Sequence, residues 1–150
     1  MLENTTKKEK LNVGIYFFIV NKKREKRKEK MKTERINEIV FLVGTSKEEN
    51  NKVIDLGNPG DIWFHARNTS SCHVLAILSN SAFSLLDKKE KRKQLRMILK
   101  KGAELVKRNT AKLRSEKNVE ITYTDIKHVE KTEYIGCVRH DREFSKAIHI

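Results

Sequence analysis

Cysteine is scarce in this sequence, and that scarcity excludes a disulfide-stabilised fold. Cys72 and Cys137 are the two cysteines among 150 residues, and neither lies in a CxxC pair. Two cysteines cannot build a disulfide framework. Because disulfides persist mainly in secreted proteins, this usage favours a reducing, cytoplasmic environment.

Long hydrophobic runs are also missing. The apolar stretch at 11–20 (LNVGIYFFIV) is shorter than the roughly 20 residues that a membrane-spanning helix needs. Lysines precede it, as in a secretory signal, but a dense charge run follows in place of a small-residue cleavage site. We interpret residues 15–20 as a buried strand and expect no membrane span, with a targeting role as the weaker alternative.

The chain also lacks the sequence motifs typical of catalysis. No Walker motif, GxGxxG or GxSxG occurs. Cys72 or Cys137 could act as a nucleophile with a histidine, but neither lies in a recognisable setting such as a helix N-terminus. We therefore expect no catalytic residues and no cofactor. A small Cys/His enzyme is the weaker alternative.

Acidic residues are in deficit relative to basic ones. The chain has 33 Lys and Arg against 20 Asp and Glu, a formal net charge of +13. A net charge this large repels itself, so an anionic partner is expected to offset it. The candidates are nucleic acid, an anionic membrane surface, an acidic protein, or a ribosome, which combines RNA and protein.

The hydrophobic pattern predicts an α+β fold, a small and mainly antiparallel sheet with one short and one long helix packed against it. A capping box from Ser46 to Glu49 begins a helix at 47–55, which Gly57 ends. Apolar residues at helical spacing predict the long helix at 85–113, where Gly102 permits a close contact. A turn is predicted at 58–61. The predicted strands are 15–20, 36–43, 62–66, 72–78, 119–124 with a kinked continuation at 127–129, 134–138 and 146–150.

The charge pattern of the N-terminal part predicts a tail and a basic insertion. Residues 1–10 are predicted to be a disordered basic tail, and residues 11–150 a single domain. Within it, residues 21–36 form a basic insertion with almost no apolar side chains, read as a long loop or a solvated helix.

Aromatic and histidine side chains gather on two of the predicted strands. If Ala66 lies opposite Cys72 in an antiparallel pair, His65 lies opposite His73, and Trp63 shares their face. Such a cluster, with Arg67 beside it, could stack RNA bases and donate hydrogen bonds. Alternatively, Trp63 packs in the hydrophobic core and the histidines form hydrogen bonds with polar groups of the sheet.

A zinc site on the same strands is disfavoured. Cys72 and His73 are neighbours and so point to opposite faces of a strand, which leaves two ligands where zinc needs three or four. We expect no metal.

The long predicted helix carries a row of cations. Side chains three or four residues apart share one helix face, so the row predicts a ridge that contacts phosphates without reading sequence. A solvated charged face is the alternative. The ridge residues are Lys89, Arg92, Lys93, Arg96 and Lys100, and Lys127 and Lys131 extend the predicted nucleic-acid-binding set. Arg139, Arg142 and Lys146 add to this surface, and His140 and Asp141 are placed at the tip of a last hairpin joined across 139–145.

Several short motifs occur in one order along most of the chain. These are Asp61-Ile62-Trp63-Phe64-His65-Ala66, Ser71-Cys72-His73-Val74, Ala103-Glu104-Leu105-Val106-Lys107, Val119-Glu120-Ile121-Thr122-Tyr123-Thr124, and Gly136 at the start of the last hairpin. In this order the sequence resembles the NFACT-R domain, the RNA-binding domain of NFACT proteins, and is similar to its stand-alone, coiled-coil-domain-containing type. The long basic insertion and the lack of glycine at 67–71 depart from the family pattern.

The resemblance implies a non-catalytic RNA-binding module for tRNA or rRNA. It also implies a setting in translation, in ribosome-associated quality control at the large ribosomal subunit. C-terminal tailing is not implied, because the sequence contains no NFACT-N domain and no coiled-coil arms. General DNA or polyanion binding, and docking on an acidic protein, are the alternatives.

Overall fold

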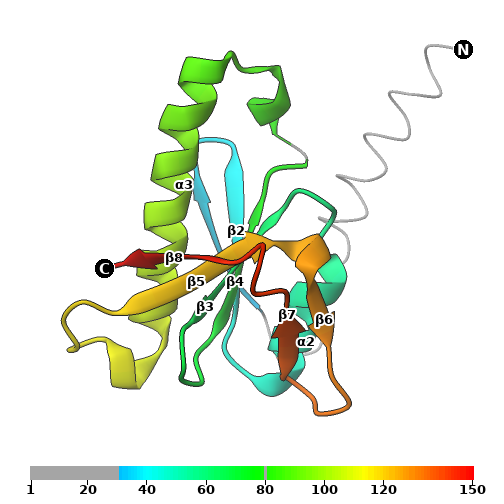
Figure 1. Cartoon of the computed structure of the whole chain (residues 1–150), viewed down its shortest axis with the longest axis vertical. Helices are drawn as coiled ribbons and strands as arrows, with labels where there is room; N and C mark the ends of the chain where they lie inside the picture. The colour runs from blue at the N-terminus through cyan, green and yellow to red at the C-terminus, as the bar shows by residue number, and fades with distance from the viewer. Residues whose placement is uncertain (1–30, 80) are drawn as a thin grey trace, which may run out of the picture. The chain divides into compact units, whose positions relative to one another are not determined.

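The computed structural model describes residues 31–79 and 81–150, and within them it confirms the α+β class. Six strands form one antiparallel sheet in the order β1-β2-β4-β3-β5-β8, and β6 pairs with β7 in a separate two-stranded sheet (Figure 1). The sheet strands are β1 (Lys32–Ile36), β2 (Ile39–Gly44), β3 (Ile62–Ala66), β4 (His73–Ile77), β5 (Glu120–Asp125) and β8 (Lys146–His149). The remaining elements are β6 (Val129–Lys131), β7 (Val138–His140), α2 (Lys47–Leu56), α3 (Lys88–Asn109) and the 3₁₀ turns η1 (Ala82–Leu85), η2 (Ala111–Leu113) and η3 (Ile126–His128).

Three N-terminal predictions lie outside the described residues. They are the basic tail at 1–10, the strand at 15–20 and the part of the basic insertion before residue 31. A single domain over 11–150 therefore stays a prediction.

Strand β1 corrects the prediction of a loop up to residue 36. Lys32–Ile36 pairs antiparallel with β2, and Ile36 faces Ile39 across a tight turn in which Asn37 has a positive φ of 54°. The strand predicted at 36–43 is β2 at Ile39–Gly44, and its first residue, Ile36, ends β1 instead. Charged side chains are common on edge strands, where they discourage pairing with other chains. Here Glu34 forms ion pairs with Lys101 and Arg108 of α3.

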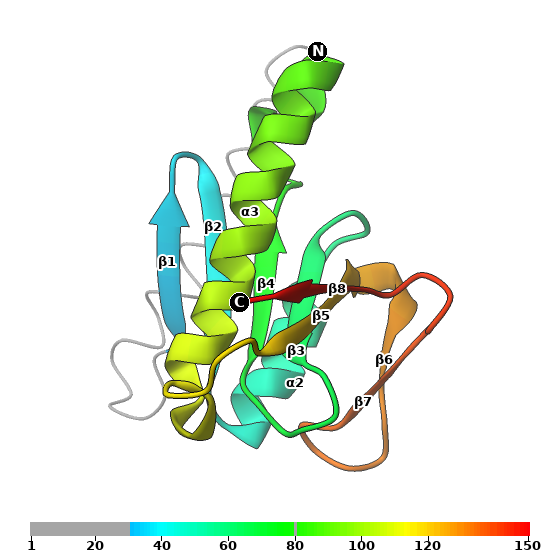
Figure 2. The same ribbon diagram turned by 60° about the vertical axis from the view of Figure 1, so that its left-hand side comes forward.

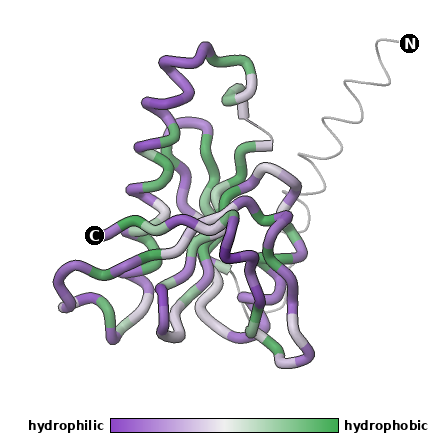
Figure 3. The backbone as a smooth tube through the Cα atoms, in the orientation of Figure 1, coloured by the Kyte–Doolittle hydropathy of each residue, from purple (hydrophilic) through white to green (hydrophobic). Residues whose placement is uncertain are grey.

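Helix α3 covers one face of the sheet (Figure 2). Alternate residues of the central strands, such as Phe41, Phe64 and Val74, are fully buried there with Ile98 and Leu105 of the helix. Figure 3 shows hydrophobic residues concentrated in the central strands and hydrophilic ones along much of α3. The helical spacing predicted this one-sided burial.

Gly102 allows α3 to approach the sheet closely. A Cβ built on Gly102 would lie 2.3 Å from the ring of Phe64, which is far shorter than van der Waals contact. The close contact predicted at this glycine is confirmed, and its partner is the central strand β3.

The second face of the sheet carries Leu42, Leu75 and Trp63, all buried, and lies against α2 and the β6–β7 hairpin. Helix α2 begins as predicted, with the Ser46 hydroxyl accepting the Glu49 amide at 3.1 Å. The Glu49 carboxylate does not return to Ser46. It accepts the amide and hydroxyl of Thr45 at 2.7 and 2.9 Å, one residue earlier than a capping box requires.

Gly57 ends α2 for a reason different from the predicted one. Its φ is −73°, so it does not adopt the left-handed conformation common after helices. A Cβ at this position would instead lie 2.7 Å from the side chain of Ile126. The glycine is needed for close packing against η3.

The C-terminal strands pair differently from the prediction. Residues 134–137 form a turn, closed by the Cys137 amide on the Tyr134 carbonyl at 3.1 Å, in place of a strand beginning at 134. Gly136 has a positive φ of 80° there and donates its amide to Asn51 of α2 at 2.9 Å. Since β7 pairs with β6 and β8 with β5, no hairpin has its tip at 140–141, and that prediction is wrong.

The Asp61 carboxylate organises the turn before β3. The predicted turn at 58–61 is confirmed by the Asp61 amide, which donates to the Asn58 carbonyl at 2.9 Å. The side chain of Asp61 is fully buried and accepts three amides, from Asn58 at 2.8 Å, Leu78 at 2.9 Å and Ser79 at 3.1 Å. The acidic residue of the Asp-Ile-Trp-Phe-His motif is therefore structural.

We expect Asp61→Ala to lower the free energy of unfolding by about 2–4 kcal/mol, because it leaves buried amides without an acceptor. Urea denaturation measures the loss. Asp55→Ala is the control, since it removes only the exposed ion pair with Lys131, and should change stability by less than about 1 kcal/mol. Equal effects of the two substitutions would contradict the structural role of Asp61.

We expect Gly102→Ala to destabilise the protein by about 1–3 kcal/mol through overpacking against Phe64, although alanine gains roughly 1 kcal/mol in helix propensity. The control is Glu104→Ala on the exposed side of the same helix. A Gly102→Ala protein as stable as the wild type in urea would show that the helix and sheet can separate without cost.

Candidate nucleic-acid interface

Three rings meet on the second face of the sheet, at the junction of β3 and β4. The pairs Ile62–Ala76, Trp63–Leu75 and Phe64–Val74 establish the register that was assumed from the sequence. The ring centroids of His65 and His73 are 4.8 Å apart. The Trp63 indole lies parallel to His65, at 5.5 Å, and edge-on to His73, also at 5.5 Å. The predicted cluster is present.

A buried hydrogen bond orients the cluster. The indole Nε1–H of Trp63 donates to Nδ1 of His73 at 3.2 Å. Since Nδ1 accepts, a neutral His73 ring carries its proton on Nε2. The backbone is fixed as well, because the His73 amide donates to Oδ1 of Asn50 on α2 at 3.1 Å.

Burial keeps both histidines neutral near pH 7. Desolvation lowers the pKa of His65 from 6.5 to about 4, a hydrogen bond with the Ala66 backbone opposes this in part, and electrostatic interactions with His140 and Lys112 add to the lowering. Desolvation, with a smaller contribution from His65, lowers the pKa of His73 to about 3. Neutral imidazoles have one donor and one acceptor nitrogen each, so the cluster adds hydrogen-bonding groups without adding charge.

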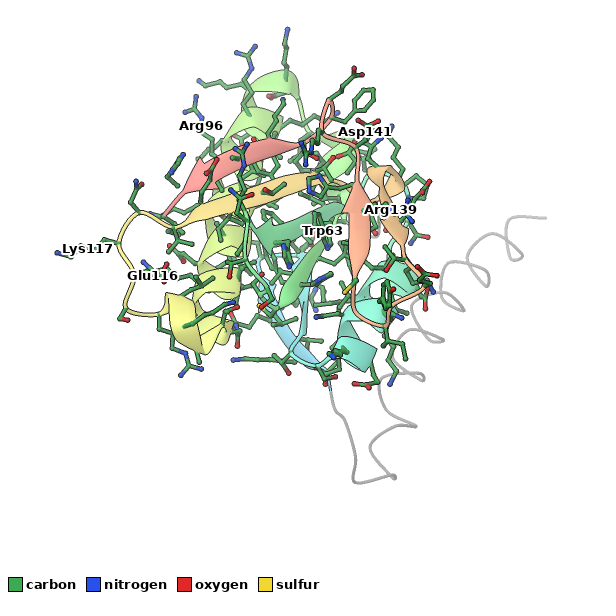
Figure 4. All side chains as sticks on the ribbon, turned by 60° about the horizontal axis from the view of Figure 1, so that its bottom comes forward. Trp63, Arg96, Glu116, Lys117, Arg139 and Asp141 are labelled. Carbon is green, nitrogen blue, oxygen red and sulfur yellow. The ribbon has the colours of Figure 1, made fainter. Side chains whose placement is uncertain are left out.

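Trp63 lies inside the protein, which corrects the expectation of an open stacking platform. Its side chain is 1% exposed. His65 lies parallel to the indole, and His140 of β7 is 5.6 Å from it. Figure 4 shows Trp63 in the interior next to the strand that carries Arg139. A base could not stack on this indole without displacing its neighbours, and Trp63 acts here as a core anchor beneath the histidines.

A pocket of about 670 Å³ opens above the cluster, a size typical of ligand sites. The polar groups at its base are His65, His73 and Thr122, and His140 borders it. Four cations from separate elements surround it, Lys47 of α2, Arg67 after β3, Arg142 after β7 and Lys146 of β8. Arg67 also forms an ion pair with Glu120 at 2.5 Å.

The predicted cationic row lies elsewhere. Its members on α3 are all exposed, namely Lys89, Arg92, Lys93, Arg96 and Lys100. Because α3 covers the sheet face opposite the ring cluster, this row and the pocket are separate surfaces. Figure 4 shows Arg96 projecting outward on α3, away from Trp63. Lys127 and Lys131 are exposed beside α2, and Lys131 forms an ion pair with Asp55.

Part of the pocket was not predicted from the sequence. Lys47 and Thr122 were not singled out, and His140 was placed at a hairpin tip. Thr122 could have been found, because it faces His65 in the β3–β5 pairing and alternates with the core residues of its strand. His140 could not, because its position depends on β7 pairing with β6.

The cysteines offer little for nucleophilic chemistry. Cys72 is buried on the α3 side, where its thiol donates to the Val106 carbonyl at 3.5 Å, and burial raises the pKa of the thiol. Within residues 31–79 and 81–150, no cysteine hydrogen-bonds to a histidine, and no group of three or more His, Cys, Asp or Glu is placed to hold a metal ion. In the same part of the chain, no helix is long and apolar enough to cross a membrane.

The lowered histidine pKa values predict a pH-dependent stability. Unfolded histidines take up protons near pH 6.5, whereas folded His65 and His73 stay neutral down to about 4 and about 3. Between these values the unfolded state binds more protons, so the free energy of unfolding falls as the pH drops below 6.5.

We expect His73→Gln to reduce the loss of thermal stability between about pH 7 and pH 5, because one of the two buried rings no longer titrates on unfolding. Calorimetry over this range measures the slope. His149→Gln is the control, since His149 is exposed, and should leave the slope at its wild-type value. An identical slope in all three proteins would show that His73 is not buried in its neutral form.

Two curated relatives share part of this sequence. The coiled-coil domain-containing protein 25 homolog of Dictyostelium discoideum is 33% identical over 96 residues, which is 63% of this chain and 43% of that protein. Coiled-coil domain-containing protein 25 of Mus musculus is 35% identical over 93 residues, 61% of this chain and 41% of that protein. The chain thus matches about two fifths of the length of these relatives.

A solved structure and a family profile complete the comparison. The C-terminal part of the fibronectin/fibrinogen-binding protein from Streptococcus suis superposes with a TM-score of 0.63 at 19% identity, covering 83% of this chain and 46% of that one, which supports the fold alone. The profile of the NFACT protein RNA binding domain matches residues 12–140. The chain therefore belongs to the NFACT RNA-binding domain family, a family of nucleic-acid-binding domains.

Proposed function

We propose that this protein is a non-catalytic module that binds structured RNA, tRNA or rRNA, in a ribosome-associated, translation quality-control setting in the cytoplasm. Membership of an RNA-binding family supports RNA as the partner class. The net charge of +13 supports a polyanion. The large ribosomal subunit is a candidate partner, because it presents folded RNA with a dense array of phosphates.

The cationic row on α3 is the observation that carries the proposal. Each of the five exposed lysines and arginines lies three or four residues from another member of the row, the spacing of one helix face. Within residues 31–79 and 81–150, none of them forms an ion pair. By contrast, Lys101 and Arg108 of the same helix are held by Glu34. The row therefore remains available for phosphates.

Contacts of this kind position a nucleic acid without reading its sequence. Recognition of RNA over DNA has to come from shape and from 2′-hydroxyl groups. A folded RNA such as tRNA offers both, and it also offers unpaired bases that a uniform duplex lacks. These features favour tRNA or rRNA over a DNA duplex as the ligand.

A non-catalytic role agrees with the chemistry of the motif residues. Asp61 is engaged by three backbone amides, the Cys72 thiol faces the helix, and Trp63 fixes His73 by a hydrogen bond. Each of these side chains forms hydrogen bonds that stabilise the fold. The Ser145 hydroxyl lies 2.8 Å from Nδ1 of His140 and donates to the Asp141 carbonyl at 2.6 Å, so its proton is not directed at the histidine.

We expect the combined change Lys89→Glu, Arg92→Glu, Lys93→Glu and Arg96→Glu to weaken tRNA binding at least about tenfold at physiological salt and to reduce the salt slope by up to about one per lost contact. Fluorescence anisotropy with labelled tRNA at several salt concentrations measures both quantities. The matched control exchanges the same residues between lysine and arginine, which keeps the charge, and should retain affinity.

A DNA duplex of similar length separates the alternatives. Stronger binding of tRNA at physiological salt supports the proposal, whereas equal binding of both would indicate a general polyanion surface. If the charge-reversed protein binds tRNA as tightly as the wild type, α3 is not the contact surface. Association with an acidic protein that survives nuclease treatment would point to protein docking instead.

A further inference from the structure

The pocket over the ring cluster lies on the sheet face opposite α3 and is separate from the cationic row. We propose that it binds one unpaired nucleotide of an RNA, with the base inside against His73 and Thr122 and the phosphate among the cations at the opening. This inference rests on the proposed RNA binding and specifies what the second surface recognises. The α3 row would hold the backbone of a structured RNA, and the pocket would detect a nucleotide outside its helices.

Two buried donors at the base of the pocket have no acceptor among the residues that the structure describes. His73 is 2% exposed, and because its Nδ1 accepts from Trp63, its proton lies on Nε2. Thr122 is 6% exposed and its hydroxyl also borders the pocket. Within the described part of the chain, neither the Nε2–H nor this hydroxyl donates a hydrogen bond to another group. A buried donor without an acceptor is costly, and the acceptors on a base edge would satisfy both.

The opening of the pocket favours an anion. Lys47, Arg142 and Lys146 line it and are all exposed. Among residues 31–79 and 81–150, these three form no ion pair. Lys47 belongs to α2, whereas Arg142 follows β7 and Lys146 begins β8, so the fold brings the C-terminal pair together with a residue that is distant in the sequence. A phosphodiester beside a bound base would meet this positive charge.

The size and lining of the pocket favour a nucleotide that is already unpaired. A volume of about 670 Å³ is ample for a nucleotide, and a concave site cannot receive a base that remains stacked in a helix. Extruding a paired base costs a few kcal/mol, whereas an unpaired base avoids most of this cost. Apolar side chains complete the walls, from Ile135, Val138 and Ala147. Flat bases suit a site with apolar walls and neutral imidazoles.

The test compares two RNA hairpins that differ by one bulged nucleotide in the stem. Fluorescence anisotropy at physiological salt gives the affinity of the full chain for each. The proposal predicts that the wild type prefers the bulged hairpin by at least about fivefold. It further predicts that Thr122→Val and, separately, Lys146→Gln bind both hairpins with similar affinity.

Two matched controls separate pocket effects from general ones. Thr124→Val makes the same change two residues along β5, on the same face, at a buried hydroxyl that donates to the Phe144 carbonyl and does not border the pocket. Lys117→Gln removes an exposed positive charge far from the opening. Both should keep the preference. Lys146 is exposed, so its substitution tests the pocket even if Thr122→Val fails to fold.

The outcomes separate this inference from the broader proposal. Equal affinity of the wild type for the two hairpins, or a preference that persists in the Thr122→Val and Lys146→Gln proteins, overturns the pocket assignment while RNA binding through α3 stands. If neither hairpin binds, the proposed function fails.

The pocket assignment is then tested by titrating the protein with adenosine and uridine monophosphates and following the NMR signal of the Trp63 indole N–H. A shift of this signal that Thr122→Val abolishes would support nucleotide binding in the pocket. No shift, or a shift with an acidic peptide alone, would overturn it.

Discussion

The pairing of β3 with β4 is the constraint on which the rest of this structure depends. In this register, Phe64 of β3 points to one face of the sheet and allows α3 to pack with Gly102 against its ring. The residues on either side, Trp63 and His65, point to the other face and meet His73 of β4. A shift by one residue would exchange the two sets and bury the histidines under the helix. One strand pair therefore defines both the hydrophobic core and the polar cluster.

The hydrogen bond between Trp63 and His73 then gives the polar cluster a single arrangement. A buried imidazole without hydrogen-bond partners could adopt either tautomer. Burial alone would lower its pKa without deciding which ring nitrogen carries the proton. With the indole N–H donated to Nδ1, the remaining donor of His73 is fixed at Nε2. Groups oriented in this way before a ligand arrives lose little freedom on binding, which favours affinity. Trp63 is thus buried and does not line an open surface, but it fixes the orientation of His73 at the base of the pocket.

Two surfaces of different character result from this arrangement. The α3 row is convex, charged and exposed, and its contacts would depend on ionic strength. The pocket is concave, with neutral groups at its base and cations at its opening. A folded RNA can engage both kinds of surface only if its helices present phosphates and its loops or bulges present free bases. This combination distinguishes structured RNA from a simple duplex.

Local sequence patterns determined which parts of this arrangement could be predicted. The alternation of Phe64 with Trp63 and His65 and the short loop at 67–71 suggested an antiparallel pair, and the register assumed for it is the one the structure has. Helical spacing was enough for α3, and the proline and glycine of 58–61 for the turn. Strand β1 was missed because an edge strand with charged side chains has no hydrophobic pattern. The pairing of β7 with β6, and with it the position of His140, was missed because pairing partners are not encoded by local residue type.

The most direct test is nitrogen-15 NMR of the histidine side chains with and without an RNA hairpin that carries one bulged nucleotide. We predict that His73 is neutral and protonated on Nε2 throughout the range from about pH 7 to pH 5. We also predict that RNA shifts the His73 and Trp63 side-chain signals and leaves exposed His149 unchanged. A His73 ring that is protonated on Nδ1, becomes charged between about pH 7 and pH 5, or does not respond to the RNA would contradict this arrangement.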